Sequence, residues 1–156
     1  MEKEESFKKA LGSAYSFIAR RPHGTKELEK KLLGKGFDPD LVNNIIEELL
    51  RKGFLNDYDV AYRWAESRIK NRLWGRAKLY NFLREKNIGK DVIDRVQQEV
   101  WEEFSEEDTA RKAVDKRFSF DMQPSQSKIL SFLKSRGFSS GVIYRIVKDV
   151  STDALD

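Results

Sequence analysis

Cysteine is absent from the 156-residue sequence, which excludes disulfides and thiolate metal sites. That absence is typical of proteins from a reducing compartment. No apolar run of about 18 residues or more occurs, so the sequence predicts no membrane-spanning helix. The N-terminal stretch MEKEESFKKALGSAY mixes acids with lysines and lacks the apolar segment of a secretory signal. We therefore expect a soluble, cytoplasmic protein without a membrane partner.

Residues that carry catalysis or bind metals are scarce as well. His23 is the only histidine, and it lies in a Pro-Gly loop without a second ligand at metal-binding spacing. Gly34-Lys35 lacks the upstream glycine and the hydroxyl residue of a phosphate-binding loop. A cluster of acids is interpreted as a solvated helix junction rather than a cation site. Its members are Glu102, Glu103, Glu106, Glu107 and Asp108. The sequence therefore predicts no enzyme, no metal, no cofactor and no small-molecule substrate.

The positive charge is small and evenly distributed. The formal net charge is +4, and it divides as +2, +1 and +1 over residues 1–54, 55–104 and 105–156. No polybasic tail stands out. Any affinity for nucleic acid must therefore come from local segregation of charge rather than from the total.

One pattern is repeated along the chain. The stretch KELEKKLLGKGF at residues 26–37 has near-copies at residues 77–88 and 127–138, at intervals of 51 and 50. Each copy spaces its apolar residues as one helix face and ends at a residue type that tolerates the left-handed conformation. Those helix-ending residues are Gly36, Asn87 and Gly137. A second amphipathic helix follows each copy, and a longer one precedes it.

The sequence thus predicts an all-α protein, built as an elongated, curved tandem array of three three-helix repeats. The predicted repeats are residues 1–54, 55–104 and 105–156. A repeat of about fifty residues buries little surface on its own, so neighbouring repeats must supply surface to each other.

Residues 61–80 contain the main candidate for partner binding. Six basic side chains and two tryptophans occur there with a single acid, Glu66. Cations interleaved with aromatics suit a phosphate backbone or an acidic protein surface, whereas the alternative is a basic helix that is simply solvated. The candidate partner-binding residues are Arg63, Arg68, Lys70, Arg72, Trp74, Arg76 and Lys78.

Two of these residues allow alternative interpretations. Helical geometry places Arg68 on the apolar stripe beside Trp64 and Ala65, where an unpaired charge is unfavourable. It is either internally paired or packed along its stem, or else a contact residue on the inner surface of the array. Trp74 precedes a glycine at a helix junction, so it either wedges two helices together or anchors a partner.

Tandem helix–turn–helix pairs also suggest a DNA-binding transcription regulator. In such proteins the second helix of the pair inserts into the major groove. The exposed positions of the predicted helix at residues 40–50 include two acids, Glu47 and Glu48, beside Asn43 and Asn44. Acids close to phosphates disfavour this mode of binding.

Several short motifs are characteristic in combination. They are Arg21-Pro22-His23 before the Glu27-Leu28 helix, Lys35-Gly36-Phe37, the run Gly53-Phe54-Leu55-Asn56-Asp57, and Ala61 with Arg68 on the following helix. With these motifs the sequence resembles the RecX family over most of its length, most closely from roughly residue 14 to residue 100.

The resemblance implies a regulator of the RecA recombinase. Members of that family are elongated, curved helical proteins that lie in the groove of the RecA–single-stranded DNA filament and dampen its recombinase, ATPase and co-protease activities. It implies a RecA filament as partner, single-stranded DNA bound weakly or through that filament, and a monomer. The alternatives are the helix–turn–helix transcription regulator and a helical scaffold for another protein.

Overall fold

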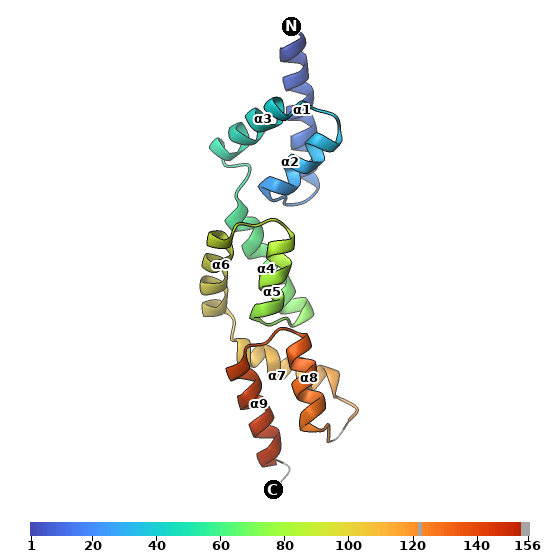
Figure 1. Ribbon diagram of the computed structural model, residues 1–156, viewed down its shortest axis with the longest axis vertical. Coiled ribbons are helices and arrows are strands. Elements are labelled where there is room, and N and C mark those ends of the chain that lie inside the picture. The colour runs from blue at the N-terminus through green and yellow to red at the C-terminus, as the bar shows by residue number, and fades with distance from the viewer. Residues whose placement is uncertain (122, 154–156) are drawn as a thin grey trace.

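The computed structural model describes residues 1–121 and 123–153, which form nine helices and no strand (Figure 1). Residue 122, in the loop before α8, and residues 154–156, at the end of the predicted third repeat, lie outside the described residues. The first repeat consists of α1 (Glu2–Arg20), α2 (Thr25–Gly34) and α3 (Pro39–Arg51). The second consists of α4 (Asp57–Arg72), α5 (Arg76–Glu85) and α6 (Lys90–Glu103). The third consists of α7 (Glu106–Arg117), α8 (Gln126–Ser135) and α9 (Ser140–Asp153).

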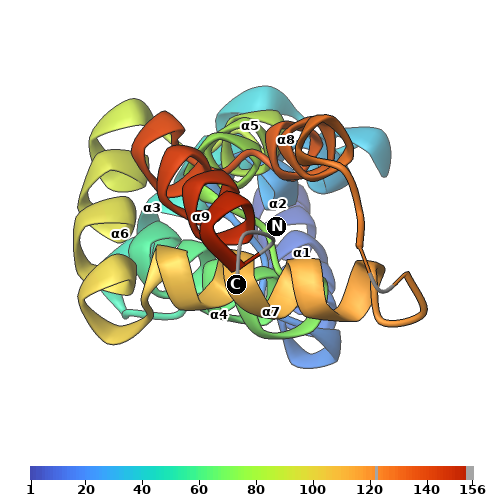
Figure 2. The ribbon, with the colours of Figure 1, turned by 90° about the horizontal axis from the view of Figure 1, so that it is seen from below.

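The three triplets are stacked along the long axis of the molecule, with α1 and α9 at opposite ends (Figure 1). Seen end-on, the triplets overlie one another (Figure 2). The extensive helix packing occurs within each triplet, as between α1 and α3, α4 and α6, and α8 and α9. The prediction of an all-α, elongated array of three-helix repeats is confirmed. Over the part of the chain that the structure describes, no helix is both long and apolar enough to cross a membrane.

Each triplet encloses its own hydrophobic core, and equivalent positions fill the three cores. The second helix of every triplet buries two fully enclosed aliphatic residues, as the sequence pattern predicts. These residues are Leu28 and Leu32, Leu79 and Leu83, and Ile129 and Leu133. Leu55 packs in the first core although it follows the predicted first boundary. The repeat boundaries after residues 54 and 104 stay predictions.

The turns after α2, α5 and α8 have the predicted left-handed residues, since φ is +92° at Gly36, +62° at Asn87 and +77° at Gly137. After α5, the backbone N–H of Ile88 donates to the carbonyl of Leu83 at 3.1 Å. This bond and its equivalent after α8 are the bonds that close a Schellman cap. The third helix of each triplet is thereby turned back against the second.

Acidic residues at the start of α4 and α7 join one triplet to the next. Asp57 accepts hydrogen bonds from the backbone N–H of Thr25 at 2.7 Å and from its hydroxyl at 2.9 Å. Glu106 accepts a bond of 3.1 Å from the backbone N–H of Arg76, and two more from Ser139. Each acid thus satisfies an N–H in the first turn of the second helix of the preceding triplet, where unpaired donors gather.

The interpretation of the whole acidic cluster as a solvated junction is wrong for Glu106. This residue is only 8% exposed, because its carboxylate lies against the ends of two other helices. Glu102, Glu103 and Asp108 are exposed as predicted.

Candidate partner-binding surface

Cationic and aromatic side chains form one cluster between α4 and α5, which we call the cation–aromatic cluster. Its members are Trp64, Arg68, Trp74, Lys78, Phe82 and Lys86. All six are half-buried. The ring of Phe82 lies at its centre, 6.1 Å from the ring of Trp64 and 5.5 Å from that of Trp74, with edge-on geometry in both pairs. Such geometry directs the positive edge of one ring at the negative face of another.

Arg68 lies over two rings of this cluster. Its guanidinium carbon is 4.6 Å from the centre of Phe82 and 5.5 Å from the centre of Trp74. Among the described residues it makes no ion pair, and its Nε is buried without a hydrogen-bond partner. The internal ion pair is therefore ruled out as an explanation, and the stem packs on aromatic faces. A guanidinium held in this way keeps unused donors, which an incoming acceptor can satisfy.

Trp74 fills the space between the end of α4 and the start of α5. Leu73, the residue before it, adopts a left-handed conformation with φ of +55° and so turns the chain sharply. One ring contact of Trp74 is with Phe82, and the ammonium of Lys78 lies 5.0 Å from the centre of its indole ring. Trp74 thus wedges the two helices together and is also half-exposed. Both proposed roles remain compatible with its position.

The other four predicted residues lie elsewhere. Arg63 lines a hollow at the junction with the first repeat. Lys70 lies over the ring of Phe104 and pairs with Glu66. Arg76 lies over Trp101 and pairs with Glu106 at 3.5 Å. Arg72 faces the third repeat, where its carbonyl accepts a bond from Arg136. The structure therefore brings together Arg68, Trp74 and Lys78 but places each of the other four in different surroundings.

Phe82 and Lys86 belong to the cluster although they lie outside the predicted stretch 61–80. The repeat itself contains a signal that identifies them. Lys86 is equivalent to Lys35 and Arg136, at intervals of 51 and 50, so a cation occurs at this position in every repeat. Phe82 is equivalent to Phe132 in the third repeat. Comparison of equivalent positions in the three repeats would have added both residues to the candidate partner-binding residues.

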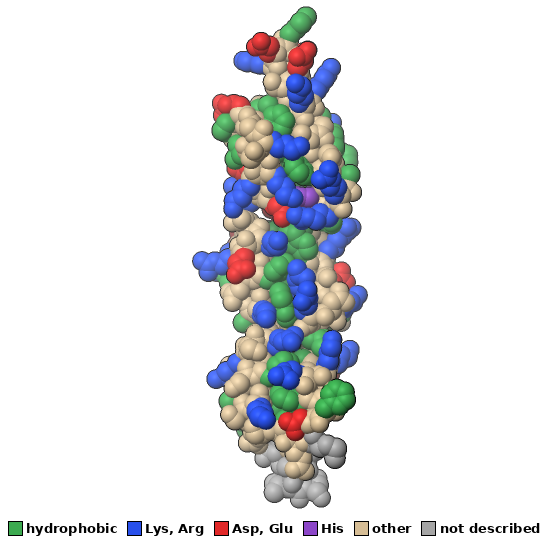
Figure 3. Space-filling model, turned by 90° about the vertical axis from the view of Figure 1, so that its right-hand side faces the viewer, with side chains coloured by type: hydrophobic (Ala, Val, Ile, Leu, Met, Phe, Trp, Pro, Cys, Tyr) green, Lys and Arg blue, Asp and Glu red, His purple; other side chains and the backbone are tan. Residues whose placement is uncertain are grey.

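Equivalent positions form related clusters in the other two repeats. In the first, the ammonium groups of Lys31 and Lys35 lie 5.2 and 5.0 Å from the centre of Phe17. In the third, the rings of Phe118 and Phe132 meet edge-on, and a guanidinium lies over each. Figure 3 shows the face on which α2, α5 and α8 lie, with Lys, Arg and hydrophobic side chains along it from the first repeat to the third. The three clusters therefore line one side of the column.

His23 has a structural position at the base of the first cluster. Only 3% of it is exposed. Its Nδ1 lies 2.8 Å from the carbonyl oxygen of Arg21, and its Nε2 lies 2.8 Å from the ammonium of Lys31. Burial, together with the neighbouring charges of Lys31 and Arg21, lowers the pKa of His23. Both ring nitrogens are thus engaged in holding the loop between α1 and α2, as a plain loop histidine does.

Comparisons with known proteins agree on one family. The family model described as the first three-helix domain of RecX matches residues 10–49, and that described as the second matches residues 56–96. The regulatory protein RecX of Amycolatopsis mediterranei is 33% identical over 150 residues, which cover 94% of this chain and 85% of the relative. That of Legionella pneumophila strain Corby is 32% identical over 156 residues and covers 94% and 98%.

Solved structures show the same fold. The crystal structure of RecX from Lactobacillus salivarius superposes with a TM-score of 0.82 at 21% identity, over 96% of this chain and 99% of the other. A second structure, of a regulatory protein RecX, gives a TM-score of 0.81 at 24% identity, over 95% and 74%.

Proposed function

This chain belongs to the RecX family of regulatory proteins, and we propose that it binds the RecA–single-stranded DNA filament and inhibits RecA recombinase, ATPase and co-protease activities. The partner in this proposal is a protein polymer. The chain acts on it by occupying a surface rather than by catalysing a reaction.

The observation that carries the proposal is the cation–aromatic cluster of the second repeat. Arg68, Lys78 and Lys86 lie over ring faces, and none of them pairs with an acid among the described residues. Arginine and tryptophan are the residues on which protein interfaces most depend, because they combine large apolar area with a polar group. A partner that offers carboxylates beside apolar surface suits this cluster.

The arrangement of the array supports a polymeric partner. Related clusters occur at equivalent positions of all three repeats and on one side of the column (Figure 3). A surface with three similar sites in a row complements a partner that also repeats, since adjacent subunits present the same groups at regular steps. Binding at several sites raises the overall affinity without any new type of contact.

In this mechanism the column lies in the groove of the filament and bridges neighbouring RecA subunits. Bridging fixes the relative position of those subunits, and occupation of the groove hinders entry of a second DNA strand. Both effects oppose filament growth and strand exchange.

Groove binding to duplex DNA is the less favoured alternative. In α3, Asn43, Asn44 and Glu47 are exposed, so an acid would face the phosphates if this helix entered the major groove. The cations that lack an ion pair in the cluster lie instead on α4 and α5.

The test is inhibition of the DNA-dependent ATPase of RecA by a variant with Lys78→Glu and Lys86→Glu. Both side chains are attached to α5 or its end, and neither makes a hydrogen bond or ion pair among the described residues, so the fold is expected to survive. We expect the concentration for half-inhibition to rise about tenfold, because two cations become acids at the contact surface.

The matched control carries Lys9→Glu and Lys90→Glu. These exposed lysines make the same change in net charge but lie on α1 and at the start of α6, outside the cluster. Inhibition by the control should equal that of the unaltered protein. If both variants lose inhibition equally, net charge and not the cluster explains the effect. Full inhibition by the cluster variant would exclude the cluster from the mechanism.

A further inference from the structure

The two junctions between the triplets are built differently. The first junction lies between α1–α3 and α4–α6, and the second lies between α4–α6 and α7–α9. At the second junction, the backbone N–H of Gly75 donates to the carbonyl of Arg136 at 2.8 Å, and that of Ala77 donates to the carbonyl of Gly137 at 2.9 Å. Within the described chain, no backbone hydrogen bond joins the triplets at the first junction. The main chain therefore connects the triplets directly at the second junction and not at the first.

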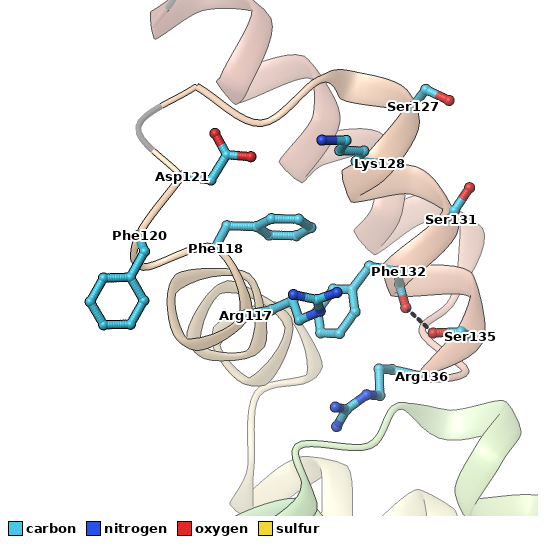
Figure 4. Close-up of a pocket in the computed structure, with 10 residues that line it drawn as sticks. All are labelled: Arg117, Phe118, Phe120, Asp121, Ser127, Lys128, Ser131, Phe132, Ser135 and Arg136. Carbon is cyan, nitrogen blue, oxygen red and sulfur yellow. Dashed lines mark hydrogen bonds between the residues drawn. The ribbon is translucent and has the colours of Figure 1, made fainter.

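Side-chain hydrogen bonds show the same difference. The guanidinium of Arg136 extends from the end of α8 toward the second triplet (Figure 4), where it donates a bond of 2.7 Å to the carbonyl of Arg72. It thereby bridges a hollow of about 380 Å³ that both residues line. A hollow of about 420 Å³ at the first junction is lined from both triplets, for example by Arg21 and Arg63, but no hydrogen bond between described residues crosses it.

Apolar packing also differs between the junctions. Leu73, at the end of α4, packs against the core of the third triplet, so the second triplet contributes to the core of its neighbour. The equivalent residue of the first triplet, at the interval of 51, is Pro22, which is exposed. Over the residues that the structure describes, no member of the first triplet packs against the second core. Neighbouring bodies move relative to each other unless a large apolar interface joins them, and only the second junction has such packing.

One side chain explains why the two junctions differ. Gly137 approaches the second triplet so closely that an added Cβ would lie 2.3 Å from the backbone nitrogen of Lys78. The equivalent residue at the first junction is Asn87, which also has a positive φ but carries a Cβ. Because this Cβ keeps the main chains apart, the first triplet meets side chains there. The atom nearest to a Cβ added at Gly24 is the Cδ1 of Ile88, at an ordinary contact distance of 3.5 Å.

We propose that the first junction is a hinge, on which the first repeat swings as one body while the second and third repeats move together as a rigid pair. The carboxylate of Asp57 is the pivot, since it accepts hydrogen bonds from the N–H and the hydroxyl of Thr25. Both bonds end on the same oxygen, Oδ1, so they fix a point of contact without fixing the angle between the bodies. Hinges of proteins typically consist of a few residues at the ends of elements, as here.

The hinge moves one of the three cation–aromatic clusters relative to the other two. The cluster of Phe17, Lys31 and Lys35 belongs to the first repeat, whereas the other clusters lie on the rigid pair. The consequence for binding rests on the proposed function. Two clusters meet the polymer at a fixed spacing, and the first adjusts to the position of the next subunit. A partner that engages all three clusters selects one hinge angle, because it binds that angle more tightly than the others.

The experiment measures distances between two spin labels by double electron–electron resonance on the whole chain, free in solution. Because the sequence contains no cysteine, introduced cysteines are the only sites that react with the label. Equivalent exposed positions on α2, α5 and α8 provide matched pairs. The first pair, Lys30→Cys with Asn81→Cys, spans the first junction, and the second pair, Asn81→Cys with Ser131→Cys, spans the second. We expect the distance distribution of the first pair to be about twice as wide as that of the second, and equal widths would overturn the proposal.

Exchange of the residues at the two turns tests the cause of the difference. Gly137→Asn places a side chain against the backbone of Lys78 and should widen the distribution of the second pair to about that of the first. Asn87→Gly keeps the left-handed turn without strain and should narrow the distribution of the first pair, since the main chains can then approach. Circular dichroism verifies the helices, and Asn87→Gly decides alone if Gly137→Asn does not fold. Unchanged widths in the folded variants would overturn the proposed cause.

Addition of RecA filaments separates this inference from the proposed function. Bound filaments should narrow the distribution of the first pair and leave that of the second unchanged, because binding selects one hinge angle. A first-pair distribution that stays wide while the filaments bind would overturn the adjustable contact. Absence of binding would contradict the proposed function instead, and the widths measured on the free protein would still decide whether the hinge exists.

Discussion

The backbone N–H of Gly75 donates a hydrogen bond of 2.8 Å to the carbonyl oxygen of Arg136, which connects the second repeat directly to the third. Next to it, the N–H of Ala77 donates to the carbonyl of Gly137 at 2.9 Å. Backbone atoms of the two repeats are therefore in contact, without side chains between them. Since the proposed contacts with a polymer need several repeats held in line, this junction controls how the clusters of those repeats are placed.

Gly75→Ala should separate the third repeat from the second. A Cβ at this position would lie 2.5 Å from the Cα of Phe138 and 2.6 Å from its nitrogen, and backbone atoms there cannot move aside cheaply. We expect a loss of unfolding free energy of at least about 2 kcal/mol, the middle of the range for overpacking. Urea unfolding measures it, and small-angle scattering should show a less extended particle.

Gly12→Ala is the control for that prediction. Gly12 lies in α1, and no atom lies within 4 Å of an added Cβ. Because alanine favours the helix over glycine, this change should stabilise the protein by about 0.5–1 kcal/mol. Equal effects of the two substitutions would mean that the close approach at Gly75 does not constrain the junction.

Glu106→Ala should destabilise the same junction by about 2–3 kcal/mol, because a charged acceptor is lost and its donors stay desolvated. Those donors are the N–H of Arg76 and the N–H and hydroxyl of Ser139. Glu102→Ala provides the comparison, since Glu102 is exposed and its removal should change stability by no more than about 0.5 kcal/mol. The measurement is thermal unfolding followed by circular dichroism. A loss at Glu106 no greater than that at Glu102 would contradict a role for its carboxylate in the junction.

The helices and cores were predictable because their signals are local. The spacing of Leu28 and Leu32 identifies a helix face from neighbouring residues alone, and the residue type at Asn87 suffices to predict a left-handed turn. The array of three repeats was predictable as well, because the same local pattern occurs three times in the sequence.

The site was less predictable because its geometry depends on residues distant in sequence. Glu106 is buried by contacts with Arg76 and Ser139, which lie 30 and 33 positions away, and no local pattern records such contacts. Within the stretch 61–80, successive side chains point in different directions around the helix axis, and the chain bends at Leu73. Side chains that are close in sequence are therefore separated in space. The position of Arg68 on an apolar stripe was predictable from helical spacing, whereas its partner ring, Phe82, required the packing of α5 on α4.

Because of His23, the free energy of unfolding should decrease as the pH falls below the ordinary pKa of histidine. Its pKa is lowered from 6.5 in the fold, mainly through burial, so the unfolded chain binds a proton more readily. The stability that depends on a neutral His23 is therefore fully present above about pH 6.5. It is lost as the pH falls through the lower pKa of the folded state. The groups that face the ring are Lys31, Arg21 and Glu27. The hydrogen bond with the carbonyl of Arg21 and the charge of Glu27 oppose the lowering of this pKa.

Urea unfolding at about pH 7.5 and about pH 5.5 checks this linkage. The loss of unfolding free energy between these values should shrink in a His23→Gln variant, which does not titrate. Glu27 and Glu48 also have lowered pKa values, and they lose their contributions only below about pH 4.5, outside this window. An unchanged pH dependence in the variant would show that His23 does not titrate in the assumed direction.

The Arg68→Leu substitution should weaken partner binding without lowering the stability of the fold. The substitution removes a cation–aromatic contact of about 0.5–1 kcal/mol, but it also removes a buried Nε without a partner, whose desolvation costs about 1–3 kcal/mol. Leucine can still pack on Phe82. We therefore expect the unfolding free energy to stay the same or to rise slightly, as measured by urea unfolding.

Inhibition of RecA should nevertheless weaken about tenfold or more in this variant, since a guanidinium at the centre of an interface is often one of its strongest contacts. Arg68→Lys, as a comparison, keeps the charge but loses the planar fork that stacks on a ring and binds carboxylates in pairs, so it should recover only part of the inhibition. A structural role alone predicts the reverse pattern, with lower stability and intact inhibition. Because the two roles predict opposite results for one substitution, the pair of measurements decides whether the unsatisfied arginine is retained for the fold or for the partner.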